Sequence, residues 1–481
     1  MGPPRPGGRS PVSATAVAGA LVALAAVVAA WLVPRRRPVA RPVPGLAAAA
    51  REVPPWRNAA AIGGEHLCAA MYLGAAGLVL AHGTDVLWLP VGAAAGCALL
   101  AAFAAAPLRR SGAYSVVDFA EWRLGSRGVR HAATGCVCLV GWCYLLPQLH
   151  GAGTALHVLT GGPPWAGWTI GVAAASVLVA SGGVRSITAF QAVHFWGKLA
   201  ALTVPVPVLA LLWHRAPAAP APEADPPGHA GTYALVLCVA LGTIGLPQVL
   251  THYYTSGGGG AARRTAAYVT VLAGLPSVVA VLYGTLGRAR EPGGPVTGAG
   301  ADAEFLLLPD RTVPGTAGAV LTGLLAAGAL AAFVTASCGI AVAVGGTVAQ
   351  YARRRGAAAF RAAAVVVLAA PLAVMPRIGP HGAAALVTLA LAVSACTLCP
   401  LLLLGIWWRG LTAPGAIAGL VIGCALAVAA GVPRPAGEDT VPAVAAAPVA
   451  AGVMVAVSLL TRRRVPRHAG RAMARLHRPD G

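Results

Sequence analysis

Long apolar stretches constrain the fold of this chain more than any other feature of its sequence. Crossing the hydrocarbon core of a bilayer takes roughly 17–25 predominantly apolar residues in a helix. Only 10% of the 481 residues are charged, against about a quarter in a typical soluble domain, and the mean hydropathy is +0.74. We therefore predict an all-α polytopic membrane protein. Its thirteen spans, separated by Pro, Gly and Arg, lie near 14–33, 58–82, 86–107, 131–159, 166–183, 187–213, 231–253, 265–287, 316–349, 362–376, 382–407, 411–431 and 441–461.

Basic residues are distributed unevenly between the predicted loops. If the spans alternate in direction, 26 of the 35 basic residues fall on one side of the membrane and eight on the other, and Lys198 lies within a span. Cytoplasmic loops carry the excess of Lys and Arg, so the N-terminus is predicted outside and the C-terminus inside the cell. The formal charge of +21 is thus a topology signal, and we expect the lipid bilayer rather than nucleic acid as the partner.

The chain is predicted to contain no soluble domain. We expect an extracellular segment at 1–13, a membrane domain at 14–461 and a basic cytoplasmic tail at 462–481. The loops 214–230 and 288–315, rich in Pro, Gly and Ala, are interpreted as short extracellular connections. The first apolar stretch has a signal peptide as its alternative interpretation, because Arg5 and Arg9 precede it; its 20 residues and the arginines at 35–37 favour a retained helix.

Neither a disulfide framework nor a metal centre is indicated. All ten cysteines fall within predicted spans, and the Cys396–Cys399 pair lies on an apolar helix without nearby partner ligands. No nucleophile with a base and an orienting group is found within the spans either, so an enzyme is not expected.

Two helices are predicted to be broken near mid-membrane. In the second span, Gly63 and Gly64 precede Glu65, which is the only acidic residue within a span. In the seventh span, Gly245 is followed by Pro247, which removes a backbone donor. Burying Glu65 or Lys198 costs on the order of 2.5–3.5 kcal/mol on insertion scales, so each is expected to face protein or a wet cavity.

Broken helices five spans apart are what an inverted repeat of five plus five helices produces. Interrupted backbone at membrane depth is tolerated where protein or water satisfies it, and its carbonyls and N–H groups form ion and solute sites. The pattern predicts a secondary transporter with a site near the midplane. Alternatively, the breaks reflect the general abundance of Gly and Pro in membrane helices.

Two further polar features lie on other spans. Thr335 and Ser337 on the ninth span could complete a shell of oxygens around a small cation, or could bond back to their own helix. Gln148, after Pro147 on the fourth span, could contact a small solute or bond a neighbouring helix.

A set of short motifs follows in order along the chain. It comprises GEHLCAA at 64–70, YSVVDF at 114–119 with RLGSR at 123–127, YLLPQLHGAG at 144–153, SGGVRSIT at 181–188 and GTIGLPQ at 242–248. This ordered set, which is more specific than any single motif, resembles the sodium:solute symporter family, and most closely its cation/acetate (monocarboxylate) branch. The similarity runs from about residue 56 to 430.

The resemblance implies a LeuT-like fold, with an inverted-repeat core at about 56–408 and a sodium site between the second and ninth helices. The cation-site positions carried over by motif are Gly63, His66, Ala332, Thr335 and Ala336. At two of the matching positions the chain departs from the family pattern. Ala336 replaces a residue with a hydroxyl, and Glu65, the predicted coupling acid, stands where Asp is usual.

Together these features predict cation-coupled uptake of a small monocarboxylate such as acetate or pyruvate by alternating access, with Na⁺ as the coupling ion. Because Glu65 and His66 could carry a proton, H⁺ is the alternative coupling ion. A proline-like amino acid is the alternative cargo, and a solute sensor or accessory subunit that does not transport is the alternative activity. Lys198 is assigned no site role. The residues predicted to contact substrate are Gln148, Thr243, Gly245, Pro247 and Gln248.

Overall fold

The computed structural model describes residues 53–83, 87–181, 184–213, 229–288, 299–351, 357–379, 381–431 and 441–478. Over these residues the chain forms helices and turns and no strands, which confirms the all-α prediction. Eight helices are long and apolar enough to cross a membrane, or up to eleven if each bent pair counts as one span. The first predicted span, 14–33, lies outside the described residues, so the total of thirteen stays a prediction, as do the orientation and the inverted repeat.

The first half of the described chain begins with the predicted broken helix. Its helices are α2 (Pro55–His66), α3 (Ala75–His82), α4 (Trp88–Phe103), α5 (Ala105–Ser111), α6 (Val116–Leu124), α7 (Arg127–Thr160), α8 (Pro164–Ser181), α9 (Val184–Thr203) and α10 (Pro205–Trp213). A π-helical turn, Ala70–Gly74, joins α2 to α3.

The second half begins with the other broken helix. Its helices are α11 (His229–Ile244), α12 (Pro247–Tyr254), α13 (Gly259–Arg288), α14 (Ala299–Thr312), α15 (Thr316–Tyr351), α16 (Ala357–Ala369), α17 (Ala383–Cys396), α18 (Leu398–Trp407), α19 (Ala413–Gly431), α20 (Val441–Leu460) and α21 (Ala469–Leu476).

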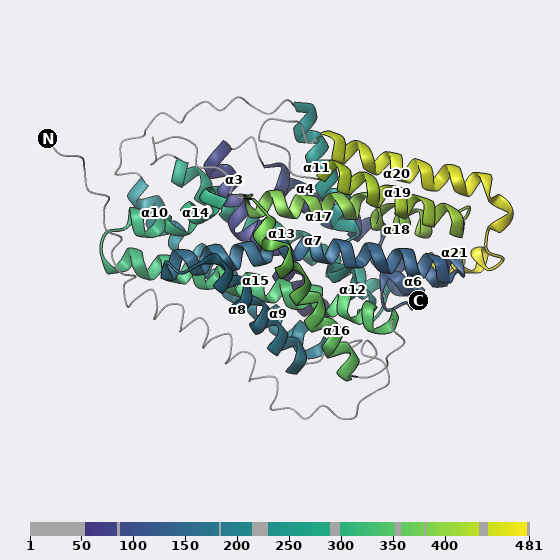
Figure 1. Cartoon of the computed structure of the whole chain (residues 1–481), viewed down its shortest axis with the longest axis horizontal. Coiled ribbons are helices and arrows are strands. Elements are labelled where there is room, and N and C mark those ends of the chain that lie inside the picture. Colours follow the sequence, from purple (N-terminus) through teal and green to yellow (C-terminus); the bar gives the residue numbers. More distant parts are fainter. Residues whose placement is uncertain are drawn as a thin grey trace.

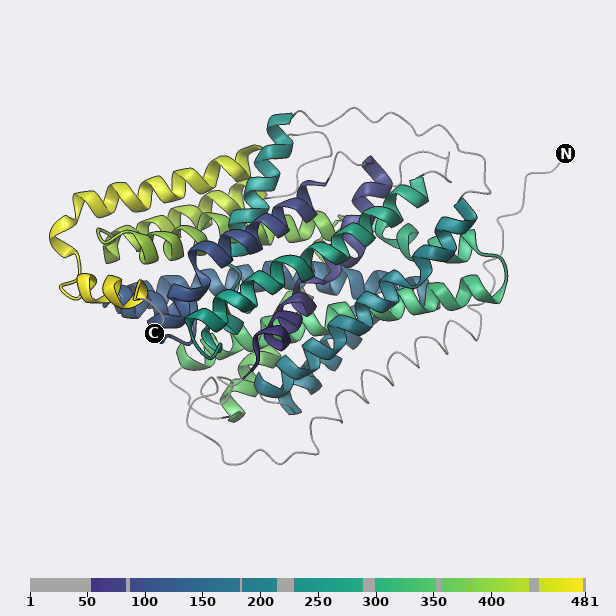
Figure 2. The same ribbon diagram turned by 180° about the vertical axis from the view of Figure 1, so that it is seen from behind.

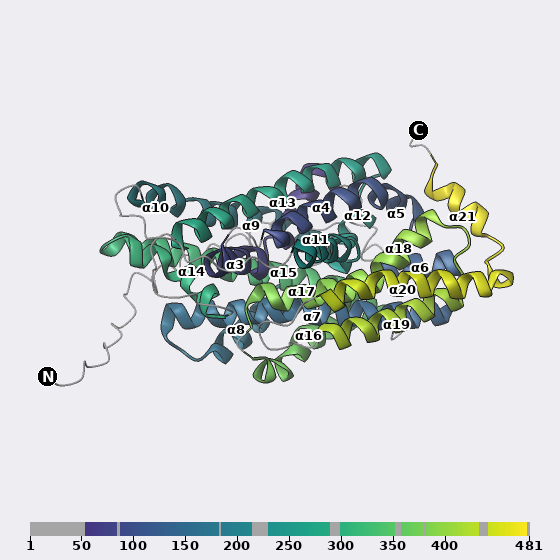
Figure 3. The same ribbon diagram turned by 90° about the horizontal axis from the view of Figure 1, so that it is seen from above.

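The helices form one elongated bundle in which α7 packs against α15 and α17 (Figures 1 and 3). The first broken helix lies against α9 and α13, and the second lies against α4 and α17. Helices α19 and α20 pack side by side along one edge, which is also clear from behind (Figure 2). Helices α2 and α15 contact each other, and both also contact α9 and α12.

Helix α14 corrects one expectation from the sequence. We interpreted 288–315 as a short connecting loop, and within it Ala299–Thr312 forms a helix. The helix is stabilised from its buried side, where the Asp302 carboxylate accepts a hydrogen bond from the backbone N–H of Ala383 at 2.8 Å and lies 3.4 Å from His150 Nε2. A buried carboxylate with these partners docks α14 onto α17 and α7.

Buried polar contacts also hold together the segments predicted to lie on the cytoplasmic side. Arg123 on α6 is fully buried and donates to the carbonyls of Gly405 at 2.9 Å and Trp408 at 3.1 Å, at the end of α18. Cations are favourable at helix C-termini, where carbonyls lack helical partners. The predicted tail contains α21, whose neighbouring His468 contacts the Trp122 carbonyl at 2.9 Å. Arg123 and α21 thus fix α6 to the C-terminal part of the bundle.

Candidate functional site

The first predicted break is present, but it lies beyond the glycines. Helix α2 continues to His66, and the chain then bends by 68° into the next segment. Gly63 and Gly64 instead allow α9 to pack closely: a Cβ on Gly64 would lie 2.7 Å from the Gln191 carbonyl oxygen. The break itself is held by Gln148, whose Oε1 accepts a hydrogen bond from the backbone N–H of Ala69 at 3.0 Å.

The second predicted break separates α11 from α12 with a bend of 43°. Pro247 begins α12, as expected for a residue without an N–H. At Gly242 the backbone touches α17, because the Ser394 hydroxyl donates to its carbonyl at 2.6 Å. At Gly245 a Cβ would lie 2.5 Å from Ser394 Oγ, so only glycine fits there without displacing α17.

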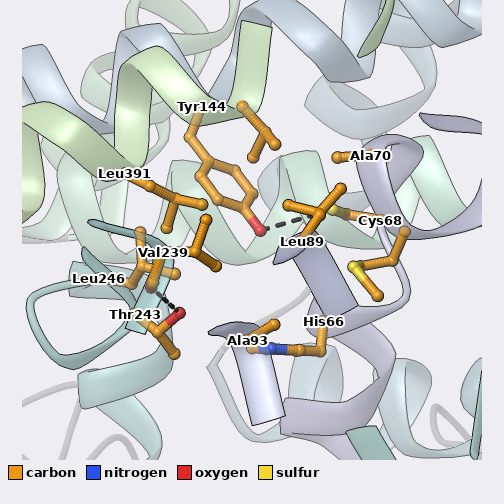
Figure 4. Close-up of a pocket in the computed structure, with 12 residues that line it drawn as sticks. His66, Cys68, Ala70, Leu89, Ala93, Tyr144, Val239, Thr243, Leu246 and Leu391 are labelled. Carbon is orange, nitrogen blue, oxygen red and sulfur yellow. Dashed lines mark hydrogen bonds between the residues drawn. The ribbon is translucent and has the colours of Figure 1, made fainter. Parts of the chain in front are cut away.

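A cavity of about 20 Å³ lies between the two breaks (Figure 4). Its polar lining comes from His66, Cys68, Tyr144 and Thr243, and the rest of its lining is apolar. The Tyr144 hydroxyl contacts Cys68 Sγ at 3.4 Å, and His66 Nδ1 has no hydrogen-bond partner among the described atoms. This volume has room for about one water molecule, so a solute could enter only if the surrounding helices moved apart.

A second cavity of about 10 Å³ lies beside Glu65 and is also lined by Gln191, Gln248 and His252. Glu65 Oε1 accepts a hydrogen bond from Gln191 Nε2 at 2.7 Å and lies 3.3 Å from His252 Nε2. His252 Nδ1 lies 3.1 Å from Asn58 Oδ1. The predicted coupling acid is thus buried in a polar cluster that joins α2, α9 and α12.

The predicted substrate residues are distributed over both cavities. Thr243 lines the first cavity and donates back to the Val239 carbonyl at 2.8 Å. Gln248 lines the second, where its Oε1 has no partner among the described atoms. Gln148, Gly245 and Pro247 shape the breaks. No ligand tests these assignments, so all five stay predictions.

One of the five positions predicted to hold a cation, Thr335, contacts the Lys198 ammonium, whose other two acceptors are neighbours of the predicted positions on the first break. Lys198 Nζ donates to the Gly64 carbonyl at 2.5 Å, to Thr335 Oγ1 at 2.7 Å and to the Leu67 carbonyl at 3.3 Å. Among the predicted positions, the Gly63 carbonyl accepts instead from the Leu67 N–H at 2.9 Å, within the helix.

The two remaining predicted positions on α15 add little to a cation shell. The Ala332 carbonyl lies 3.1 Å from Thr335 Oγ1, and Ala336 presents a buried methyl group. At an effective dielectric of about 20, a Na⁺ ion roughly 3–4 Å from the Lys198 ammonium would be repelled by roughly 4–6 kcal/mol. The residues present therefore do not fit Na⁺ while Lys198 is charged.

Sequence reasoning missed the partners of the charged groups. It found Glu65 and Lys198 because they are ionisable residues within apolar spans, but it gave Lys198 no role. Gln191 lies seven residues before Lys198 on α9, and this spacing places both on one helix face. A neutral polar residue on the same helix face as an intramembrane charged residue was the sequence signal that could have identified these partners.

Comparison with known proteins agrees with this architecture. Residues 47–195 match the family described as the sodium:solute symporter family. The chain is 26% identical over 395 residues to YwcA of Bacillus subtilis, called an uncharacterized symporter, with 76% of each chain covered. It is 28% identical over 425 residues to a protein of Corynebacterium glutamicum called monocarboxylic acid transporter, covering 76% of this chain and 74% of the relative.

Solved structures of transporters share the fold. A Na⁺-coupled sialic acid symporter aligns with a TM-score of 0.72 at 13% identity, over 93% of this chain and 97% of the symporter. Mhp1, a nucleobase-cation-symport-1 family transporter, aligns with a TM-score of 0.55 at 14% identity, over 91% of this chain and 99% of its own. With the family match over residues 47–195 and two relatives that align with three quarters of the chain, this multi-pass membrane protein is similar to members of the sodium:solute symporter family.

Proposed function

We propose that this chain imports a small monocarboxylate such as acetate or pyruvate across the cell membrane, by alternating access and driven by a cation gradient. The observation that carries the proposal is the cavity between the two helix breaks, lined by His66, Tyr144 and Thr243. Discontinuous helices at the bilayer midplane are where secondary transporters bind solutes. The proposed orientation has the N-terminus outside and the C-terminus in the cytoplasm.

The chemistry around the cavity suits a small anion. Helix α12 begins at Pro247, and the first N–H groups of a helix lack helical acceptors and carry partial positive charge. The Tyr144 hydroxyl adds a donor, whereas the apolar lining suits a short alkyl chain. The relative from Corynebacterium glutamicum supports this choice by its name. A proline-like solute is the competing cargo.

Two cations are candidates for the coupling ion. The family name and the sialic acid symporter support Na⁺. The contact between Lys198 and Thr335 Oγ1, one oxygen of the predicted cation site, supports H⁺ as the second candidate, since a charged ammonium disfavours a second cation beside it.

Uptake into proteoliposomes tests the proposal. Purified protein is reconstituted, and accumulation of labelled acetate, pyruvate and proline is measured with an inward Na⁺ gradient or an inward H⁺ gradient. We expect acetate or pyruvate to accumulate above protein-free liposomes under at least one gradient. Accumulation of proline alone would replace the monocarboxylate by an amino acid. Solute binding without accumulation under either gradient would favour a sensor and would refute transport.

A pair of threonine variants tests the cavity. Thr243→Val removes the hydroxyl that lines it, and we expect a higher KM for acetate with little loss of stability. Thr347→Val is the matched control, because Thr347 is also buried and donates back to its own helix, to the Ala343 carbonyl at 2.9 Å. Equal KM values for the two variants would remove Thr243 from the solute site.

A further inference from the structure

Lys198 is the only lysine in the chain, and all 34 other basic residues are arginine. The side chain is 1% exposed and lies in the middle of the bundle on α9. A lysine ammonium is a compact charge with three N–H donors, whereas a guanidinium is a larger plane with five. A chain that otherwise uses arginine exclusively therefore retains the compact cation at this one buried position.

The hydrogen-bond acceptors around Lys198 match an ammonium in their number and type. Its three donors have three acceptors, two carbonyls from the segment of the first helix break and one hydroxyl from α15. Ca²⁺ takes about six to eight oxygen ligands, at least twice as many as the ammonium uses here. Position 336, one residue after Thr335, carries a methyl group in place of a hydroxyl.

The charge balance also matches one resident cation. Glu65 is the only carboxylate on α9 and on the helices that pack against it, which are α2, α10, α13 and α15. The other ionisable groups of the first break are His66 and Cys68, α9 also carries His194, and α15 carries Cys338 and Tyr351. One ammonium balances one carboxylate, and a metal cation on the same oxygens would have no counter-charge.

We propose that the Lys198 ammonium is the resident cation of this site, in place of sodium, and that it links the broken first helix to α15. Transport by this chain then needs no Na⁺ at these oxygens. The assignment of Lys198 rests on its three contacts, and only the consequence for transport rests on the proposed function.

Binding of radiolabelled Na⁺ to the purified full-length protein tests the site without any solute. We expect no saturable binding by the wild type, and the same result for Thr335→Val. Saturable binding by the wild type that is lost in Thr335→Val would overturn the proposal, because it would place Na⁺ on the hydroxyl that Lys198 uses.

The single lysine also provides a direct spectroscopic probe. Protein labelled with carbon-13 at lysine Cε gives one side-chain signal, assigned by its loss in Lys198→Met. We expect this signal to stay unchanged when choline is replaced by Na⁺ at constant ionic strength. A saturable shift specific to Na⁺ would show that sodium displaces the ammonium, and would overturn the proposal.

Uptake separates the two proposals. Acetate or pyruvate uptake under a proton gradient is measured in a Na⁺-containing buffer and in a choline-containing buffer. If the site holds a resident ammonium, the two uptake rates are nearly equal. Uptake that requires Na⁺, together with saturable Na⁺ binding, overturns the Lys198 proposal and leaves the transporter function intact. Absence of uptake under either gradient, with no Na⁺ binding, refutes the proposed function and leaves the assignment of Lys198 standing.

Discussion

Replacing Gly339 with alanine should disrupt the Glu65 cluster through a single added methyl group. Gly339 lies on α15 directly against Glu65, and an added Cβ would lie 1.9 Å from Glu65 Oε1 and 2.9 Å from Gln191 Nε2. The carboxylate is 3% exposed and is held by Gln191 and His252, so it can move only by leaving these partners. Gly346 on the same helix is the matched control, because its added Cβ would meet no atom within 4 Å.

The expected size of the effect follows from separating the Glu65 carboxylate from its two polar partners. A hydrogen bond to a charged group contributes about 1.5–3 kcal/mol, so separation from both Gln191 and His252 costs roughly 3–6 kcal/mol. Alanine in place of glycine inside a helix offsets about 1 kcal/mol of this cost. We therefore expect Gly339→Ala to lower the free energy of unfolding by roughly 2–5 kcal/mol, and Gly346→Ala to leave it unchanged or raise it by up to about 1 kcal/mol.

Thermal unfolding of the purified protein measures the difference. Eight of the ten free cysteines are buried, so a thiol-reactive dye reports their exposure on unfolding. We expect the apparent Tm of Gly339→Ala to lie several degrees below those of the wild type and of Gly346→Ala. Equal apparent Tm values for the two alanine variants would refute the reasoning, since they would show that Glu65 can leave its partners without cost.

Two further substitutions are expected to act through buried hydrogen bonds. Arg123→Met removes the charged donors to the Gly405 carbonyl and its neighbours, and should lower the free energy of unfolding by about 3 kcal/mol or more. The control Arg127→Met, at an exposed position, should change the free energy of unfolding by no more than roughly 0.5 kcal/mol. Similar Tm values for the two variants would contradict this prediction. Gln148→Leu leaves the Ala69 N–H without its partner and should cost about 1–3 kcal/mol. A Tm for Gln148→Leu equal to the wild-type value would show that the break does not depend on this bond.

Apolar length, arginine distribution and the placement of Gly and Pro were sufficient to predict a polytopic helical protein with two broken helices. These features are local, because the cost of exposing backbone or charge to lipid depends on the segment itself. The exact position of the first break could not be predicted from the sequence. Gly63 and Gly64 lie in intact helix because α9 packs onto them, and the bend follows His66.

The sequence by itself determined that Glu65 and Lys198 must be buried within the bundle, since neither charge is stable in contact with lipid. Only the tertiary structure decided which groups surround them. Lys198 meets Gly64 and Thr335 across 134 and 137 residues, and these meetings depend on how each helix is rotated and packed. Because helix packing is set by side-chain shape over whole interfaces, no local pattern reveals that the lysine contacts the Thr335 hydroxyl, where the family resemblance had implied sodium.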